Sequence, residues 1–352
     1  MSVQLYSGAL TLVQKSGVGQ AVEHQREMLR RCGIPATDTA AADARVVHCN
    51  TVFPDSPLEA LWARLRGKKV VYYGHSTRED FKHSFRGSDQ LSGLFCRWIR
   101  FCYNCGDVVI TPTPYSKRLL ESYGVRKPIY ALSNGVDTDF FAPSQARRQA
   151  FRRRYGLAEG EKAVLSVGHM IARKGLVEFL ELARSLPSVR FFWFGYTAPK
   201  LIPPAVRQAI AKAPPNVAFP GFVSREELRE AYCGCDVFAF LSHEETEGIV
   251  VLEALACGIP TVLRDIPVYE DWLADGVQVY KAADDAQALR LVDGILAGTL
   301  PSTSRAGREL AKARSLERMG RQLRSIYDRE NLPYWEPFPA MRPQLDQCAR
   351  IR

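Results

Sequence analysis

The sequence has no long hydrophobic run. Its 352 residues contain no stretch of about 18 uncharged apolar residues, the length that a membrane-spanning helix needs. Gln4, Gln14 and Lys15 interrupt the early apolar residues, so the pattern of a secretory signal peptide is missing as well. We therefore expect a protein that stays in the cytosol and does not span a membrane.

Cysteines spaced for zinc are also absent. The nine cysteines include a CxxC at Cys102 and Cys105 and a CxC at Cys233 and Cys235, but neither motif has a second pair at zinc-site spacing. An odd count in a chain without a signal peptide fits reduced thiols. We expect the cysteines to be buried core residues rather than metal ligands.

Acidic residues are scarce in one segment of a basic chain. The formal net charge is +9, and residues 61–100 carry nine Lys or Arg against three acids. Basic surface of this kind attracts polyanions, so nucleic acid and anionic lipid are both open as partners. The segment lacks an RRM, KH or helix-turn-helix signature, which disfavours nucleic acid.

Large apolar residues lie among and beside these charges. Leu58, Leu61, Trp62 and Leu65 recur at i, i+3, i+4 and i+7, which predicts one apolar face of a helix. A second group of aromatic residues follows at 95–103. A basic amphipathic helix with Trp on its apolar side can lie in a bilayer interface, although most such helices in soluble proteins pack on a core. The periodicity alone leaves both outcomes open.

Short apolar runs alternate with helical patterns along the chain. The runs that predict strands are SVQLYS, ARVVHCN, KKVVYYGHS and DVVITPT in the first part, then AVLSVGHM, VRFFWFGY, VAFPGF, CDVFAFLS and IPTVLRD. Such alternation predicts parallel sheets wound with helices. Turn residues and Pro143 separate the two series. We predict an α/β protein with two similar domains at 1–150 and 151–330, a cleft between them, and a Pro-rich tail at 331–352.

The segment SHEETEGIVVLEALACGIP combines glutamates with an apolar helix. Glu245 precedes a helix predicted to begin at Gly248, and Glu253 lies about two turns along it. The free N–H groups at such a helix start can bind phosphate, while carboxylates accept hydrogen bonds from sugar hydroxyls. A sugar nucleotide needs that combination. The acidic residues could instead only complement the helix dipole, and the segment by itself does not decide.

The same segment resembles the E-x7-E motif of family 4 glycosyltransferases with the GT-B fold, which are retaining enzymes that use activated sugars. Glu, Gly, Glu, Ala-Leu-Ala and Gly-x-Pro all fall in register. In that family the first Glu contacts hydroxyls of the donor sugar and the second binds the nucleotide ribose, which implies these roles for Glu245 and Glu253. Thr246-Glu247 departs from the Pro-Phe that is common in the family.

Three further segments resemble elements of this family. SVGHMIARKG matches the donor element with Lys174 as diphosphate ligand, but His169 replaces the usual Arg, and we assign Arg173 to the donor in compensation. KSGVGQAVEHQREML resembles the glycine loop beside the donor, although Val22 occupies the third glycine site of a dinucleotide fingerprint. YYGHSTREDF places His75 just past a strand, as in members whose His lies beside the reacting sugar; a lone His is more often structural. The resemblance implies two catalytic residues, His75 and Glu245, and the donor-binding residues Gly17, Gly19, Arg173, Lys174, Gly248, Ile249, Val250 and Glu253.

Asp137-Thr138-Asp139 forms a DxD sequence. In another glycosyltransferase architecture this pattern binds a divalent metal through hard oxygen ligands. Within SNGVDTDFF it resembles instead the interdomain N-G-[VI]-D turn of family 4. We therefore expect neither a metal nor another cofactor.

The resemblance covers the chain from about Leu5 to about Gly298 and is strongest to bacterial enzymes that glycosylate diacylglycerol. In those enzymes a basic, aromatic surface of the N-terminal domain holds the protein on the anionic inner leaflet of the cell membrane. The resemblance implies a peripheral membrane hexosyltransferase that moves glucose or galactose from a UDP-sugar to diacylglycerol or to a monohexosyl-diacylglycerol. The implied membrane contacts are Trp62, Arg64, Leu65, Arg66, Lys68, Lys69 and Trp98.

Two rival functions stay open at this point. One is a family 4 enzyme that acts on a soluble or polyprenyl-linked glycan, and the other is a non-enzymatic protein that binds polyanions or anionic lipid through its basic segment. Glucose cannot be told from galactose, because epimers differ by one hydroxyl. The order of sugar addition is equally undetermined.

Overall fold

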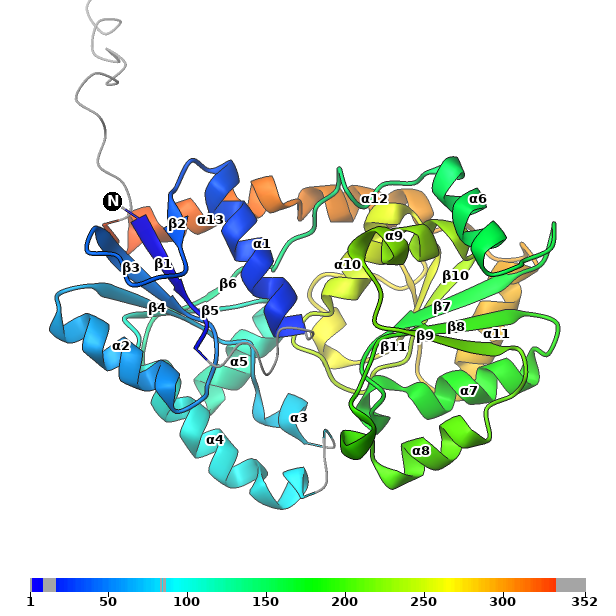
Figure 1. Cartoon of the computed structure of the whole chain (residues 1–352), viewed down its shortest axis with the longest axis horizontal. Coiled ribbons are helices and arrows are strands. Elements are labelled where there is room, and N and C mark those ends of the chain that lie inside the picture. The colour runs from blue at the N-terminus through cyan, green and yellow to red at the C-terminus, as the bar shows by residue number, and fades with distance from the viewer. Residues whose placement is uncertain (1, 9–16, 83, 85–86, 334–352) are drawn as a thin grey trace, which may run out of the picture.

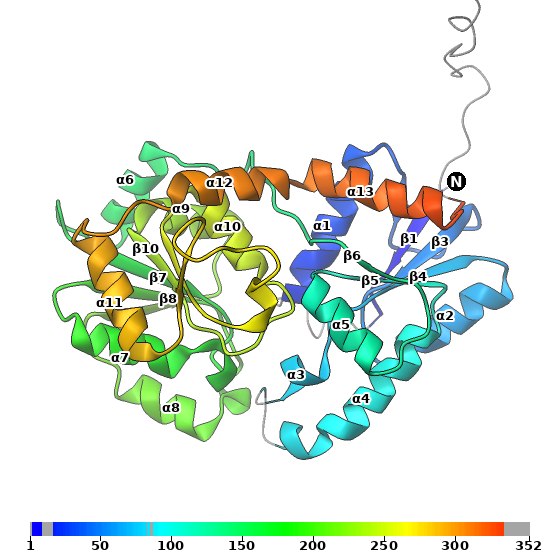
Figure 2. The same cartoon turned by 180° about the vertical axis from the view of Figure 1, so that it is seen from behind.

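The protein folds into two α/β domains, each with one six-stranded sheet (Figure 1 and Figure 2). The structure is a computed structural model, and it describes residues 2–8, 17–82, 84 and 87–333. Within those ranges no helix combines the length and apolarity that crossing a bilayer requires. The predicted tail lies almost entirely outside the described residues, because its part from 334 to 352 is not among them.

The first domain is a parallel sheet covered by helices on both faces. Its strands are β1 (Ser2–Tyr6), β2 (Ala36–Thr37), β3 (Ala44–Cys49), β4 (Lys69–Tyr73), β5 (Val108–Thr111) and β6 (Ile129–Ala131), and its helices are α1 (Gly17–Arg31), α2 (Asp55–Leu65), α3 (Arg78–Phe81), α4 (Ser88–Asn104) and α5 (Pro114–Ser122). The strand order is β2-β1-β3-β4-β5-β6. Strands such as β4 are apolar almost throughout, because helices bury both faces of a parallel sheet.

The second domain repeats this plan. Its strands are β7 (Ala163–Val167), β8 (Arg190–Phe194), β9 (Val217–Gly221), β10 (Val237–Phe240), β11 (Thr261–Arg264) and β12 (Tyr280–Ala282), and its helices are α6 (Gln145–Arg154), α7 (Leu176–Ser185), α8 (Pro204–Ala211), α9 (Arg225–Gly234), α10 (Ile249–Cys257), α11 (Asp285–Leu296) and α12 (Ser304–Ala313), with short 3-10 turns η2 (Ala172–Lys174), η3 (Pro199–Leu201) and η4 (Pro267–Tyr269). The strand order is β12-β11-β10-β7-β8-β9. All neighbouring strands in both sheets are parallel, which confirms the predicted α/β class with two Rossmann-like domains.

Two chain segments cross between the domains and contact each other. One joins β6 to α6, and the other joins α12 to α13 (Leu316–Arg329). The N–H of Val136 donates to the carbonyl of Arg314 at 3.0 Å, and the N–H of Leu316 donates to the carbonyl of Val136 at 3.1 Å. The crossing segments therefore form one hydrogen-bonded junction.

Helix α13 packs on the first domain, although it follows the second in sequence. Leu323 and Ile326 of α13 share a buried cluster with Met28 and Leu29 of α1, and Figure 2 shows α13 lying along that side of the first sheet. This helix therefore packs on the first domain, although its residues lie within the range 151–330 predicted for the second. The reason is that the apolar side of α13 completes the core of the first sheet.

The cysteines are free thiols wherever the structure describes them, and most of them are buried. Cys102 on α4 and Cys105 at the C-cap of that helix lie in the core of the first domain, and Cys235 lies in the core of the second domain. Their surroundings are apolar side chains, which agrees with the expected role in the core.

Candidate active site

The second sheet has a switch point between β7 and β10. The chain adds β8 and β9 on one side of β7 and then places β10 on the other side. In open α/β sheets, ligands bind beyond the carboxyl ends of the strands at such a point. The segments that follow these two strands are 168–175 and 241–248, so the fold brings together the two elements that the sequence assigned to the donor.

Glu245 and Lys174 form an ion pair at this switch point. Lys174 Nζ lies 2.5 Å from Glu245 Oε1, with 14% and 8% of the two side chains exposed. Burial alone would raise the pKa of Glu245, but the charges of Lys174 and Arg173 and hydrogen bonds from Lys174 and Ser242 outweigh it and lower the pKa. The carboxylate is therefore ionised at neutral pH and can accept bonds from hydroxyls.

Helix α10 begins with an uncapped N-terminus. Gly248 is its N-cap with φ of 86°, and within the described residues no side chain caps this end. A Cβ at Gly248 would lie 3.2 Å from Val251 Cγ2 and 3.4 Å from Tyr269 Oη, so both backbone conformation and space favour glycine. The amides of Ile249 and Val250 begin the helix and offer the kind of donors that bind phosphate.

Glu253 lies on the buried side of α10. It is 4% exposed, and the hydroxyl of Tyr232 on α9 donates to its Oε2 at 3.0 Å. Burial raises the pKa of Glu253 to about 7, against the opposing effects of the Tyr232 bond and the charge of Arg225. Tyr232 had no motif to single it out in the sequence, and only the contact between α9 and α10 reveals its role.

His75 follows β4 in the first domain, as predicted. It is 9% exposed; its Nε2 lies 3.3 Å from Gln25 Nε2, and its ring stacks on Tyr73 with 5.6 Å between centroids. Burial lowers the pKa of His75 to about 4, so the imidazole is neutral at pH 7 and can donate one hydrogen bond and accept another. Its contact with a sugar stays a prediction.

Helix α1 begins at Gly17, and Gly19 is buried in its first turn. The preceding part of the predicted glycine loop, residues 9–16, lies outside the described residues. Among the described residues, and apart from its own helix backbone and chain neighbours, no atom lies within 4 Å of a Cβ placed on Gly17. The donor roles of Gly17 and Gly19 stay predictions.

Arg173 joins the two domains. Its Nη1 lies 2.7 Å from Asp80 Oδ1 and donates to the carbonyl of Glu244 at 2.6 Å, while its Nε donates to Ser84 Oγ at 3.2 Å. The guanidinium is thus engaged with the first domain and with the acidic segment. The donor role that we assigned to it is not seen in these contacts and stays a prediction.

A hollow of about 560 Å³ opens between the domains beside Arg173. Its lining from the first domain is Glu79 and Lys82, and its lining from the second is Ala172, Arg173, Val177, Glu178, His243 and Glu244. Burial, together with Asp80, Glu79 and Glu245 nearby, raises the pKa of Glu244 to about 7, although a bond from Tyr115 opposes this. A cleft between the domains was predicted, but the residues that line this hollow were not, because its walls come from both domains.

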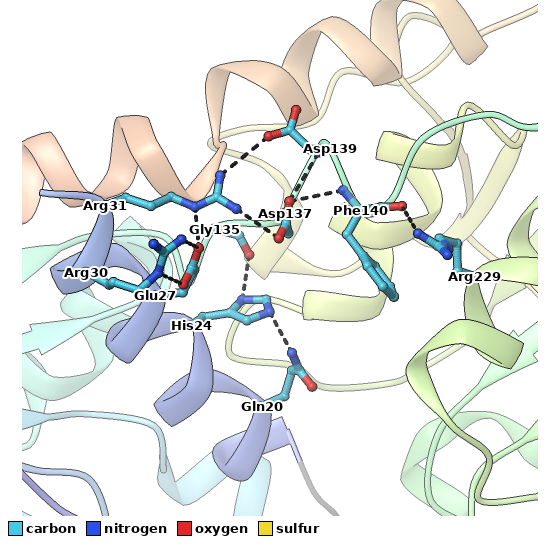
Figure 3. Close-up of polar contacts among 10 residues, drawn as sticks. All are labelled: Gln20, His24, Glu27, Arg30, Arg31, Gly135, Asp137, Asp139, Phe140 and Arg229. Atoms are coloured by element: carbon cyan, nitrogen blue, oxygen red, sulfur yellow. Dashed lines mark hydrogen bonds and ion pairs between the residues drawn. The ribbon is translucent and has the colours of Figure 1, made fainter. Parts of the chain in front are cut away.

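The DxD sequence forms part of the interdomain junction. Asp137 Oδ2 lies 2.9 Å from Arg31 Nη2, and Asp139 Oδ2 lies 3.7 Å from Arg31 Nη1. Asp137 Oδ1 also accepts hydrogen bonds from the backbone N–H groups of Asp139 and Phe140 (Figure 3). These carboxylates therefore stabilise the turn between β6 and α6 and fix it to α1.

Helix α2 turns its large apolar residues outward. The exposed fractions of Leu58, Leu61, Trp62 and Leu65 are 66, 41, 52 and 81%. The side of α2 that faces the sheet consists of small residues, namely Ser56, Pro57, Ala60 and Ala63. The predicted apolar face exists, and it does not cover the core.

Helix α4 extends this apolar area. It lies beside α2 on the same face of the first sheet (Figure 1), and it exposes Leu91, Leu94 and Phe101 by 50, 67 and 49%. We call the exposed apolar residues of the two helices the α2/α4 surface. A basic hollow of about 690 Å³ adjoins it, lined by Arg97, Arg100, Phe101, Asn104, Gly124, Arg126 and Lys127.

The predicted membrane contacts are not equivalent in the structure. Trp98 is half-buried, and its indole N–H donates to the carbonyl of Val52 at 2.6 Å, so part of this side chain packs on the protein and its membrane contact stays a prediction. Arg66 lies 4.3 Å from the centre of the Trp62 ring, and Lys69 is exposed. Two other cations have partners within the chain: Arg64 lies 3.5 Å from Asp107, and Lys68 donates to the carbonyl of Ala41.

The chain is similar to known glycosyltransferases over both domains. Residues 147–309 match the family described as glycosyl transferases group 1, and residues 26–140 match glycosyltransferase family 4. Over 329 residues the chain is 37% identical to the processive diacylglycerol alpha-glucosyltransferase of Acholeplasma laidlawii, with 93% of this chain and 98% of that relative covered. It is 27% identical over 273 residues to the alpha-galactosylglucosyldiacylglycerol synthase of Streptococcus pneumoniae, with 73% and 71% covered.

A similar fold occurs in solved structures. The complex of Anabaena HepE with UDP-glucose superposes with a TM-score of 0.74 at 15% identity, covering 94% of this chain and all of that one. Sucrose-phosphate synthase from Thermosynechococcus elongatus has a TM-score of 0.71 at 19% identity, with 81% and 73% covered. At these identities the likeness concerns the fold.

Proposed function

The chain belongs to the family 4 glycosyltransferases of the GT-B fold, and we propose that it transfers a hexose from a UDP-sugar to diacylglycerol or to a monohexosyl-diacylglycerol at an anionic membrane surface. Glucose is the favoured hexose, because the relative that is 37% identical over almost its whole length is named as a diacylglycerol alpha-glucosyltransferase. As a member of this family the protein is a hexosyltransferase.

The donor proposal rests on three groups that meet at the switch point of the second sheet. The ionised Glu245 suits sugar hydroxyls, the open start of α10 suits a diphosphate, and Glu253 on the same helix suits a ribose. Lys174 adds a cation beside them. A nucleoside diphosphate sugar presents these three kinds of group in one molecule.

The α2/α4 surface is the observation that supports the proposal of a lipid acceptor. A helix whose large apolar residues face outward while its small residues face the core is unusual for a soluble domain, in which contiguous apolar patches are small. Cations flank the patch, with Arg66 over Trp62 and four Lys or Arg in the adjoining hollow. Apolar insertion combined with attraction to anionic headgroups describes a peripheral membrane contact.

In the proposed reaction the protein stabilises charge on the leaving diphosphate. Lys174 and the first amides of α10 supply that stabilisation where charge develops in the transition state. Glu245 and the neutral His75 orient the sugar by hydrogen bonds. We infer retention of the anomeric configuration, as the family resemblance implies, and the hollow lined by Glu79 and Glu244 is where the acceptor would approach between the domains.

The test is a matrix of two donors and two acceptors. UDP-glucose and UDP-galactose are each offered with diacylglycerol and with glucosyl-diacylglycerol, in mixed micelles and in anionic vesicles, and products are identified by mass, sugar composition and anomeric NMR. We expect transfer of glucose to a lipid acceptor with an α linkage. Transfer to soluble glycans alone, or no turnover of either UDP-sugar, would overturn the proposal.

A further inference from the structure

Glu247 occupies a position where this chain departs from its family. It lies between Glu245 and Gly248, where the family commonly has Phe, and it is 1% exposed. Its Oε2 accepts two hydrogen bonds from Asn134, at 2.9 Å from the backbone N–H and at 2.8 Å from the side-chain amide. Arg314 Nη1 lies 3.7 Å from the other carboxylate oxygen. One buried side chain of the donor segment thus contacts both segments that cross between the domains.

The turn that Glu247 contacts is held from the first domain. His24 Nδ1 on α1 lies 3.1 Å from the carbonyl oxygen of Asn134 and 3.0 Å from that of Gly135, and His24 Nε2 lies 2.7 Å from Gln20 (Figure 3). Arg31, about two helical turns further along α1, pairs with Asp137. The turn therefore has a fixed place relative to α1.

A second contact fixes the same donor segment to the first domain. The carbonyl of Thr246 accepts hydrogen bonds from Thr113 Oγ1 at 2.9 Å and from Ser116 Oγ at 3.1 Å, both at the start of α5. Residues 245–248 are therefore attached to the first domain through Thr246 and to the interdomain turn through Glu247. The two residues of this segment with proposed donor roles, Glu245 and Gly248, flank these attachments.

We propose that Glu247 is a positioning residue, which holds the donor segment 245–248 to the interdomain turn and thereby sets the place of the Glu245 carboxylate relative to the first domain. A buried carboxylate that loses its hydrogen-bond donors is costly, so the segment cannot shift away from Asn134 without penalty. Misplacement of a catalytic group by about 1 Å can cost about 10²-fold in rate. This inference rests on the proposed donor role of Glu245.

The experiment compares the binding of UDP and of UDP-glucose to full-length variants by calorimetry, together with kcat. Glu247→Ala should lower the preference for UDP-glucose over UDP by about 10-fold and lower kcat by about 10- to 100-fold, because the sugar contact is misplaced while the nucleotide contacts remain. Asn134→Ala should change both quantities in the same direction but less, because the backbone N–H of residue 134 still donates to Glu247. The double variant should lose little more than Glu247→Ala alone, because the side-chain bond that Asn134→Ala removes is one of the two bonds that Glu247→Ala removes. Glu247→Gln should recover most of the loss, since its amide oxygen can still accept both bonds from Asn134.

Glu309→Ala on α12 is the matched control, because this glutamate is exposed and pairs only with Lys312 in the described structure; it should leave both ligand affinities unchanged. A purely structural Glu247 would lower the melting temperature and the active fraction without changing the UDP-glucose to UDP preference. That outcome, or additive losses in the double variant, would overturn the inference. If Glu247→Ala fails to fold, Asn134→Ala tests the side-chain bond by itself, with a smaller loss expected in the same direction. Failure of the wild type to bind UDP-glucose would instead overturn the proposed donor, and this inference with it.

Discussion

Replacing Glu245 with Gln tests the centre of the proposed site. Gln keeps the size of the side chain and removes the charge that Lys174 and Arg173 stabilise against burial. If Glu245 contacts the sugar more strongly in the transition state than in the ground state, kcat should fall by about 10²-fold, which corresponds to about 2.7 kcal/mol of transition-state stabilisation. The binding of UDP, which lacks the sugar, should change far less.

The same replacement also leaves Lys174 without its carboxylate partner. Breaking a fully buried ion pair costs about 3–5 kcal/mol, and Lys174 is 14% exposed and keeps a Gln oxygen as acceptor, so we expect roughly 1–3 kcal/mol of destabilisation. Glu181→Gln is the matched control, because Glu181 pairs with Arg184 at the surface, and it should cost less than about 1 kcal/mol and leave kcat unchanged. Calorimetry measures the loss of stability, and steady-state kinetics measures kcat. A folded Glu245→Gln protein with near-normal kcat would remove Glu245 from the site.

Three further predictions concern pH, metal and membrane. Burial raises the folded-state pKa of Glu253 to about 7 from an ordinary 4.5, so between these pH values the folded protein binds more protons than the unfolded chain and loses stability as pH rises. Glu253→Gln should therefore be more stable than wild type at pH 8, by on the order of 1–3 kcal/mol. Equal pH profiles of the melting temperature for the two proteins would contradict this. Activity should survive EDTA, because Lys174 and the start of α10 can stabilise the diphosphate; complete loss that magnesium or manganese restores would assign Asp137 and Asp139 to a metal. Changing four exposed cations to Gln should weaken binding to anionic vesicles by about 10²-fold or more, since each cation near the membrane surface contributes ~1 kcal/mol. Added salt should likewise weaken the binding of wild type to these vesicles. The four are Arg66, Lys69, Arg97 and Arg100. The control with the same charge change far from the α2/α4 surface is Arg305, Lys312, Arg318 and Arg321 to Gln, and equal flotation of both variants with such vesicles would leave the membrane contact without support.

The strands that the sequence predicted are present, and the three that it missed are short. Each of the nine apolar runs contains a strand, whereas β2, β6 and β12 have only two or three residues. Alternation of helix and strand patterns is local information, because it depends on which side chains a helix or a strand must bury. A strand of two residues carries no such period and forms only where a neighbouring strand offers hydrogen bonds.

In the candidate site, too, local spacing was predictable from the sequence and long-range contacts were not. The E-x7-E spacing placed Glu245 before a helix and Glu253 on it from sequence alone, since helix geometry fixes that relation. The pairing of Glu245 with Lys174, seventy-one positions away, exists only because the switch point brings the ends of β7 and β10 together. The bond from Tyr232 to Glu253 likewise depends on the contact between α9 and α10.

The sequence by itself determined the α/β class, the presence of two domains and the apolar period of α2, because these follow from local patterns of burial. Only the tertiary structure decided which side of each pattern meets the core. Small residues of α2 pack on the sheet and leave Trp62 and Leu65 outside. The indole of Trp98 donates to a carbonyl on another segment, and α13 returns to the first domain. Periodicity states that a helix has an apolar side, but the surface that this side meets depends on distant parts of the chain.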